Sequence, residues 1–132
     1  MGLNRSLIRK MYPAERFEVA PERVQVFANA VGHPGDGVPP TFVTAPEIAA
    51  GLAHVLVDPD LGLDLSRVLH GEEQYEWVRP LEPGETVTAI ATIEDIRGRP
   101  SLEFLILRTE IRDASSSLVC LARSTLIHRG ER

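Results

Sequence analysis

The sequence predicts a single α+β domain in which one antiparallel sheet packs against helices on one of its faces. Two segments with the 3.6-residue period of helices come first, and four segments with the two-residue period of strands follow them: 72–79, 86–93, 102–111 and 118–127. Short turns join these four segments, which favours antiparallel pairing and leaves the helices together on one side. The 132 residues are the length of one ordinary domain, so we expect one domain over residues 1–132.

Charge and hydropathy narrow the class of protein. The net charge of −5 is spread along the chain, so we expect no nucleic-acid partner. The longest apolar run, 48–57, has about ten residues and contains His54, which makes it too short for a membrane span. The start of the chain lacks the apolar core of a signal peptide, and the single cysteine, Cys120, excludes an internal disulfide. These features predict a cytoplasmic protein without a membrane partner.

The first third of the chain predicts a short strand and a helix. Residues 16–20 alternate enough for a strand, and Pro21 suits the first turn of a helix, with Glu22 close to its positive end. The helix is expected to stop at Gly32, because glycine is typical of helix C-termini. Its apolar positions follow at helical spacing: Val24, Phe27, Ala28 and Val31.

A second helix is predicted from Thr44 to about Asp58. The stretch Thr44-Ala45-Pro46-Glu47 has the pattern of a capping box, in which the Glu47 side chain would accept a hydrogen bond from the backbone N–H of Thr44 at the N-terminus of the helix. Glycine costs ~1 kcal/mol relative to alanine inside a helix, so we expect either a ligand or a neighbouring backbone to approach closely at Gly51. Small residues make this whole helix slender: Ala45, Ala49, Ala50, Gly51 and Ala53.

The later segments predict which side chains face the core. Tyr75 and Trp77 share one face of segment 72–79 and are interpreted most simply as core residues. Segment 102–111 is apolar on both faces at its centre, as in a central strand. About five strands wrapped around one slender helix form the hot-dog arrangement, and its open sheet edges predict pairing with a second copy or a relative. One side of segment 86–93 is apolar at Val87, Ala89, Ala91 and Ile93.

Five stretches resemble one family across nearly the whole chain. In order, they are NRSLIRKMYP, FEVAPERVQVFANAVG, PPTF, LHGEEQYEWVRPLEPGE and CLARSTLI. They look like the N-terminal-type MaoC dehydratases, also called FAS1-like dehydratases. These are hot-dog subunits related to (3R)-hydroxyacyl-thioester dehydratases and (R)-specific enoyl-CoA hydratases. The resemblance implies a lyase-type function in fatty-acid or polyketide metabolism, an acyl thioester of coenzyme A or acyl carrier protein as ligand, and no cofactor.

The catalytic segment of that family is missing. In relatives an Asp-x-Asn-Pro-x-His segment follows the first helix, and its aspartate and histidine hold and activate the water. Here the two asparagines of the chain, Asn4 and Asn29, both precede that position. The stretch HPGDGV offers His33 and Asp36 in reversed order within a shortened turn. We therefore expect no catalytic residue here and interpret this candidate pair as structural.

The resemblance implies further candidates outside this turn. His70, in the stretch LHGEEQ, is expected at the rim of the acyl-thioester tunnel or at a subunit contact, or else in a local pair with Glu72 or Glu73. The four histidines and the cysteine lack metal-ligand spacing, so no metal is expected. Tyr75 and Trp77 could alternatively line the acyl tunnel instead of packing in the core. The residues predicted to bind the acyl chain are then Gly51, Leu52, Tyr75 and Trp77.

Three functions remain open on these observations. The first is a non-catalytic subunit that binds the acyl chain and pairs with a catalytic hot-dog subunit. The second is a homodimeric enzyme, either a divergent hydratase or an acyl-CoA thioesterase with Glu47 as its carboxylate. The third is a non-catalytic carrier of an acyl ligand. The missing segment favours the first over the second, and the resemblance along the chain favours the first over the third.

Overall fold

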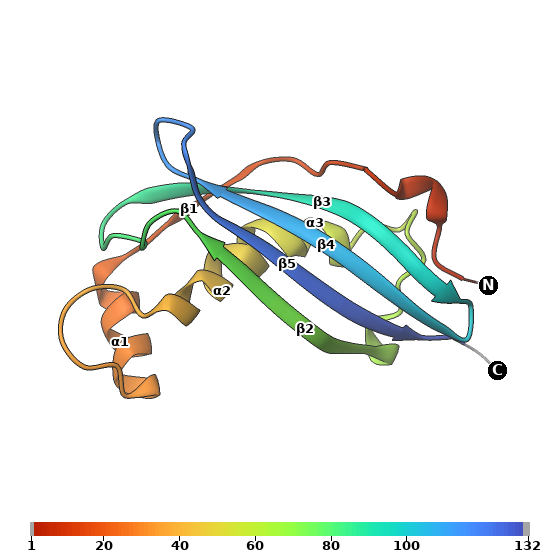
Figure 1. Ribbon diagram of the computed structural model, residues 1–132, viewed down its shortest axis with the longest axis horizontal. Helices are drawn as coiled ribbons and strands as arrows, with labels where there is room; N and C mark the ends of the chain where they lie inside the picture. Colours follow the sequence, from red (N-terminus) through yellow and green to blue (C-terminus); the bar gives the residue numbers. More distant parts are fainter. Residues whose placement is uncertain (1, 131–132) are drawn as a thin grey trace.

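The computed structural model describes residues 2–130 and shows a curled antiparallel sheet wrapped around a helix (Figure 1). The sheet has five strands in the order β1-β3-β4-β5-β2, which confirms the predicted architecture and places β4 at its centre. The strands are β1 (Glu15–Glu18), β2 (Val68–Trp77), β3 (Thr86–Arg99), β4 (Leu102–Arg112) and β5 (Leu118–Arg129).

Two helical regions come before most of the sheet. The first, α1 (Pro21–Val31), ends at Gly32, whose φ of 70° is the left-handed conformation that glycine allows. The central helix consists of α2 (Thr44–Pro46), the π-helical segment η3 (Glu47–Leu52) and α3 (Ala53–Leu56). Short 3-10 turns are η1 (Arg5–Leu7), η2 (Pro40–Val43) and η4 (Leu65–Arg67). No helix within residues 2–130 has the length and hydropathy of a membrane span.

The core lies between the central helix and the inner face of the sheet. Gly51 of the helix packs directly on this face, because a Cβ at its position would lie 2.8 Å from Thr109 Cγ2. The glycine therefore lets the sheet approach the helix closely. The inward side chains of β3 alternate as the sequence predicts and are fully buried: Val87, Ala89, Ala91 and Ile93.

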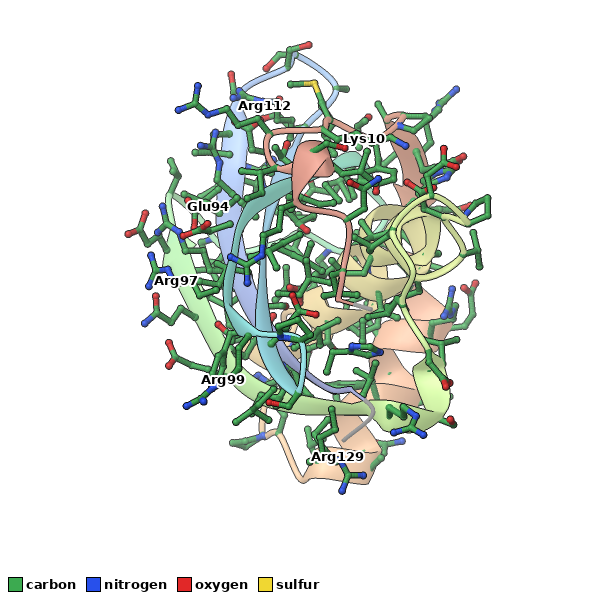
Figure 2. All side chains as sticks on the ribbon, turned by 90° about the vertical axis from the view of Figure 1, so that its right-hand side faces the viewer. Lys10, Glu94, Arg97, Arg99, Arg112 and Arg129 are labelled. Atoms are coloured by element: carbon green, nitrogen blue, oxygen red, sulfur yellow. The ribbon has the colours of Figure 1, made fainter. Side chains whose placement is uncertain are left out.

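The outer face of the sheet is charged. Figure 2 shows Glu94, Arg97 and Arg112 extending away from the core. Several of these charges are paired: Arg97 and Arg112 with carboxylates of their own strands, and Glu94 of β3 with Arg123 of β5 across the intervening strand β4, where Arg123 Nε lies 3.0 Å from Glu94 Oε2. The sheet thus buries one face against the helix and presents the other to solvent, as expected for antiparallel sheets with helices on one side.

The predicted capping box at Thr44 is wrong. The 3-10 turn η2 runs directly into α2, so Thr44 already lies inside the helical region, and its hydroxyl donates to the carbonyl of Thr41. No side-chain hydrogen bond caps α2. Glu47 is therefore not needed at the helix terminus, and its carboxyl group is buried against the sheet instead.

Trp77 is not the core residue that the strand pattern predicts. The residue is 37% exposed, because it lies at the end of an edge strand that has a neighbouring strand on one side only. Tyr75, two positions earlier on the same face, is partly buried and packs against the core.

The two edges of the sheet are covered to different extents. Next to β1, the N-terminal segment runs along β3, where the Tyr12 N–H donates to the carbonyl of Ala91 at 2.8 Å and the Arg9 N–H to that of Ile93 at 2.7 Å. At the opposite edge, the ten-residue strand β2 pairs with β5 and with no other strand of the described chain. The backbone groups on its outer side form the open edge that the sequence predicts.

Candidate functional site

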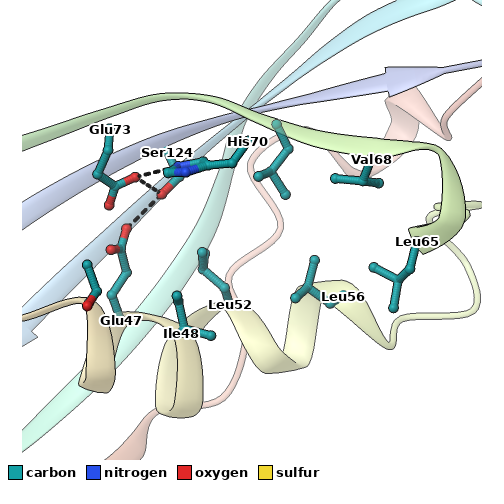
Figure 3. Close-up of a pocket in the computed structure, with 11 residues that line it drawn as sticks. Glu47, Ile48, Leu52, Leu56, Leu65, Val68, His70, Glu73 and Ser124 are labelled. Atoms are coloured by element: carbon teal, nitrogen blue, oxygen red, sulfur yellow. Dashed lines mark hydrogen bonds and ion pairs between the residues drawn. The ribbon is translucent and has the colours of Figure 1, made fainter.

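A pocket of about 350 Å³ lies between the central helix and β2 (Figure 3). Most of its wall is apolar and comes from the helix, from β5 and from β2 with the turn before it: Ile48, Leu52, Leu56, Leu65, Val68 and Leu126. The polar side chains of the lining are Thr44, Glu47, His70, Glu73 and Ser124. An apolar pocket with a few convergent polar groups is typical of small-molecule sites.

Three elements bring the polar side chains together. Glu47 begins the π-helical segment η3, and such segments are frequent at functional sites because they break the regular helical repeat. Glu73 and Ser124 are directly opposite each other in β2 and β5. Residues that are opposite in neighbouring antiparallel strands share one face of the sheet. The central helix packs on that face, so Glu47 meets both of them.

Glu47 and Glu73 contact the same hydroxyl group. Ser124 Oγ lies 2.7 Å from Glu47 Oε2 and also hydrogen-bonds to Glu73 Oε2. The Tyr75 hydroxyl donates to Glu47 Oε1 at 3.1 Å. A serine hydroxyl has one hydrogen, so it can donate to only one of the two carboxyl groups. The other hydrogen bond requires a protonated carboxyl group, and the geometry therefore holds one proton on the pair.

The surroundings of the two carboxyl groups move their pKa values apart. Glu47 is 1% exposed, and this burial, together with the neighbouring Glu73, raises the pKa of Glu47 to about 8. Burial also opposes ionisation of Glu73, but its contacts with Glu47 and Ser124 outweigh it and hold the pKa of Glu73 below its usual range. At neutral pH Glu47 is thus the acid that donates to Ser124, and Ser124 donates to the Glu73 carboxylate.

His70 connects this pair to solvent. Its Nε2 lies 3.1 Å from Glu73 Oε2, and its side chain is 56% exposed. This contact is the local pair with Glu73 that the sequence suggests as one alternative. Glu73 Oε1, in contrast, is shielded from solvent and has no hydrogen-bond partner among residues 2–130. The site therefore contains an acid, a carboxylate and one acceptor oxygen that is still free.

The residues predicted to bind the acyl chain lie in different places. Leu52 lines the apolar part of the pocket, and Tyr75 donates a hydrogen bond to Glu47, which lines its polar end. Gly51 faces the sheet instead, and Trp77 lines a separate pocket near the loop before η2. Of the candidates of the sequence, Leu52, His70 and Glu47 line the pocket, and Tyr75 does not.

His33 and Asp36 lie in the loop after α1, and neither lines the pocket. Asp36 is exposed and His33 is half-buried. The loop turns sharply at Gly35 and Gly37, whose φ values of 78° and 98° suit glycine. This conformation agrees with a shortened turn.

Sequence reasoning missed Glu73 and Ser124 as members of a site. A signal was present in the last strand, where Ser124 occupies an inward position between the apolar residues Ala122 and Leu126. A second signal was Glu47 itself, a carboxylate at the start of an otherwise apolar helix. The part of the chain that the structure describes holds no group of three or more His, Cys, Asp or Glu side chains arranged to bind a metal ion.

Comparison with known proteins assigns the chain to a family. A family model described as the FAS1-like dehydratase domain region matches residues 18–122. This chain belongs to the FAS1-like dehydratase family. A UPF0336 protein of Saccharopolyspora erythraea is 34% identical and covers 98% of this chain and 94% of its own length. A UPF0336 protein of Streptomyces coelicolor is also 34% identical and covers 98% of this chain and 97% of its own length. The resemblance that the sequence indicates is thereby confirmed.

Solved structures share the fold of this chain. A chain of the HadBC (3R-hydroxyacyl-ACP dehydratase) complex from Mycobacterium tuberculosis has a TM-score of 0.76 and 20% identity, covering 92% of this chain and 96% of that one. HtdX from the same organism has a TM-score of 0.79 and 18% identity, and the match covers 91% of this chain and 51% of HtdX. A chain of the ChsH1–ChsH2 complex from Mycobacterium tuberculosis has a TM-score of 0.69 and 14% identity, and the match covers 93% of this chain and 86% of that one. These likenesses confirm the hot-dog fold.

Proposed function

We propose that this chain is the non-catalytic, acyl-chain-binding subunit of a (3R)-hydroxyacyl-thioester dehydratase or enoyl-thioester hydratase. Membership of the FAS1-like dehydratase family supports the class of reaction. The observation that carries the non-catalytic role is the loop after α1. It has His33 and Asp36 in place of the Asp-x-Asn-Pro-x-His segment, and neither side chain lines the pocket.

The apolar wall of the pocket supports the acyl-binding role. Leu52, Leu56 and Val68 face the same space from the helix and from β2. Each methylene group that a ligand buries there contributes about 0.8 kcal/mol. We therefore assign this wall to the acyl chain of a thioester carried by coenzyme A or by an acyl carrier protein.

The outer edge of β2 is the surface that we assign to the catalytic partner. An unpaired edge strand is a template for pairing with a strand of another chain. Near both ends of β2, Leu69, Trp77 and Val78 are 52%, 37% and 66% exposed, so apolar side chains accompany the free backbone groups. The similar HadBC and ChsH1–ChsH2 structures are described as complexes of two components, which supports a hot-dog subunit as the partner.

Reconstitution tests this proposal. The purified chain, alone and mixed with a hot-dog relative that carries the complete Asp-x-Asn-Pro-x-His segment, is assayed for hydration of crotonyl-CoA and longer enoyl thioesters. We expect no turnover by this chain alone and an increase in the activity of the relative when this chain is added. Turnover by this chain alone at the rate of the mixture would overturn the non-catalytic assignment.

A further inference from the structure

A second buried polar pair lies further along β5 from Ser124, at the end of the sheet. His128 of β5 is directly opposite Glu103 of β4, so the two side chains share the inner face. They are 4% and 1% exposed. Each has one buried atom without a hydrogen-bond partner in the described chain, Nδ1 of His128 and Oε2 of Glu103. Such groups are rare in native proteins and cost free energy.

The other polar atom of each side chain ties a segment of the chain to the sheet. Glu103 Oε1 accepts from the backbone N–H of Leu3 at 2.7 Å. His128 Nε2 accepts from the backbone N–H of Asp64, with 3.2 Å between the two nitrogens. A neutral imidazole that accepts at Nε2 carries its hydrogen on Nδ1. The unpartnered Nδ1 is therefore a donor, and the unpartnered Oε2 of the residue opposite is an acceptor.

The hydrogen bond from Asp64 positions one wall of the pocket. Asp64 immediately precedes the turn η4, and the loop that leads into this turn makes no other hydrogen bond to a strand of the described chain. The turn carries Leu65 and leads into Val68, and both line the pocket. Figure 3 shows these two side chains across the pocket from Leu56. The position of the wall thus depends on the acceptor at His128 Nε2.

We propose that His128 is a pH-sensitive positioning residue for this wall. In the neutral form its Nε2 holds Asp64, and with it the turn η4, against the sheet. A proton taken up from solvent occupies Nε2 and converts it into a donor, so two N–H groups then face each other and the hydrogen bond breaks. The imidazolium turns to the carboxyl group of Glu103, and its Nδ1–H donates to the unused Oε2. Acid therefore releases η4 and weakens the wall that Leu65 and Val68 form.

Charged groups face His128 from several parts of the chain. The carboxyl groups of Glu103 on β4 and of Asp64 before η4 attract the imidazolium. The guanidinium groups of Arg5 in η1 and Arg67 in η4 each lie 3.5 Å from one of these carboxyl groups and offset their charge. The residue opposite on β2 is a valine and adds no charge. The surrounding charges nearly balance, so the proton on the ring decides which partner the ring has.

NMR spectroscopy of the full chain tests the hydrogen bond. The nitrogen shifts of the His128 ring report its protonation, and the hydrogen-exchange protection factor of the Asp64 amide reports local opening. Imidazole side chains ordinarily change charge between about pH 5 and pH 8, so both conditions are measured. We expect the protection factor of Asp64 to fall about tenfold as His128 is protonated, because the amide loses its acceptor. Amides of the central strand β4 should keep their protection.

Two glutamine variants provide the matched comparison. In His128→Gln the side-chain oxygen takes the place of Nε2 and accepts from Asp64, but it does not titrate. His54→Gln removes a histidine that contacts Glu15 instead. The protection factor of Asp64 should change less than about threefold between the two conditions in His128→Gln, and in His54→Gln it should fall as in the unaltered chain. Thermal melting checks that each variant folds, and the measurement on the unaltered chain stands without either variant.

Binding of decanoyl-CoA gives the functional readout. This readout rests on the proposed function, which makes an acyl thioester the ligand of the pocket. Dissociation constants are measured at the same two pH values by isothermal titration calorimetry. We expect acidification to weaken binding about threefold more in the unaltered chain and in His54→Gln than in His128→Gln, because the released wall buries less of the acyl chain.

The outcomes separate this device from the proposed function. A His128 ring that stays neutral at the lower pH, or an Asp64 amide that keeps its protection beside a protonated ring, would overturn the switch and leave the acyl-binding role intact. Equal pH dependence of protection or of binding in His128→Gln and His54→Gln would also overturn it. If decanoyl-CoA bound at neither pH, the acyl-binding role would fail, and hydrogen exchange would still decide the role of His128.

Discussion

Glu47 on the central helix and Glu73 on the edge strand β2 hydrogen-bond to the same hydroxyl, that of Ser124. This arrangement ties the outermost strand of the sheet to the helix beneath it through a shared proton. It also places that proton at the polar end of an apolar pocket. The ionisation of one side chain therefore bears on both the stability of the fold and the chemistry of the pocket.

The stability of the protein should fall as the pH rises through the pKa of Glu47. Burial raises this pKa to about 8 in the folded chain, against an ordinary value of 4.5. A raised pKa stabilises the fold fully below the unfolded value, and the contribution is lost as the pH rises toward the folded value. Between about pH 5 and 8 the free energy of unfolding should fall by up to about 1.4 kcal/mol per pH unit more than in Glu47→Gln. Urea unfolding measures this, and equal slopes would contradict it.

Gly51→Ala should destabilise the protein, although alanine is the better helix former. The added Cβ would lie 2.8 Å from Thr109 Cγ2, and overpacking of this kind lowers the free energy of unfolding by ~1–3 kcal/mol. Thr109→Ser removes that methyl group, so the double variant should regain part of the loss. A double-mutant cycle from urea unfolding measures the coupling, and strictly additive effects would exclude a direct contact.

Leu56→Phe should shorten the longest acyl thioester that the chain binds. Leu56 lines the pocket, so a larger side chain there removes space from the apolar wall. Val57→Phe makes the same kind of change at a neighbouring position that is 73% exposed and should leave the length limit unchanged. Binding of saturated acyl-CoAs of increasing length measures the limit. The same limit in both variants would argue against acyl binding in this pocket.

Trp77→Ala should weaken the association with a second subunit. The side chain lies at the end of the open edge strand and is partly exposed, and buried tryptophans at interfaces often contribute most of the binding free energy. We expect a loss of about tenfold or more in affinity, measured by sedimentation with the partner. Leu102→Ala, at an exposed site on β4, serves as the control. A 14.5 kDa monomer at micromolar concentration, with and without the partner, would refute association.

Replacing both His33 and Asp36 by alanine should leave the activity of the reconstituted complex within a few-fold. Both side chains lie in the loop after α1 and outside the pocket, so no general acid or base is removed. Steady-state hydration rates of the complex measure this. A loss of about 10²–10⁴-fold, the usual effect of removing such a group, would make the pair catalytic.

The sequence by itself determined the order and type of the elements and much of the core. Alternation along β3 placed Val87, Ala89, Ala91 and Ile93 inward. Pro21 and Gly32 marked the two ends of α1. These features depend on side-chain periodicity and backbone preferences that act over a few residues. The same local reasoning failed at Thr44, because the preceding turn η2 extends the helical region past the residue that would have been its cap.

The tertiary structure alone decided where the polar chemistry lies. The register of β2 and β5 sets Glu73 opposite Ser124, and the packing of the helix on that face adds Glu47. Each contact joins elements that are distant in the chain, so no local spacing encodes it. The proton shared by the two carboxyl groups follows from burial and from the single hydrogen of the hydroxyl between them. Both conditions arise only when the sheet has closed around the helix.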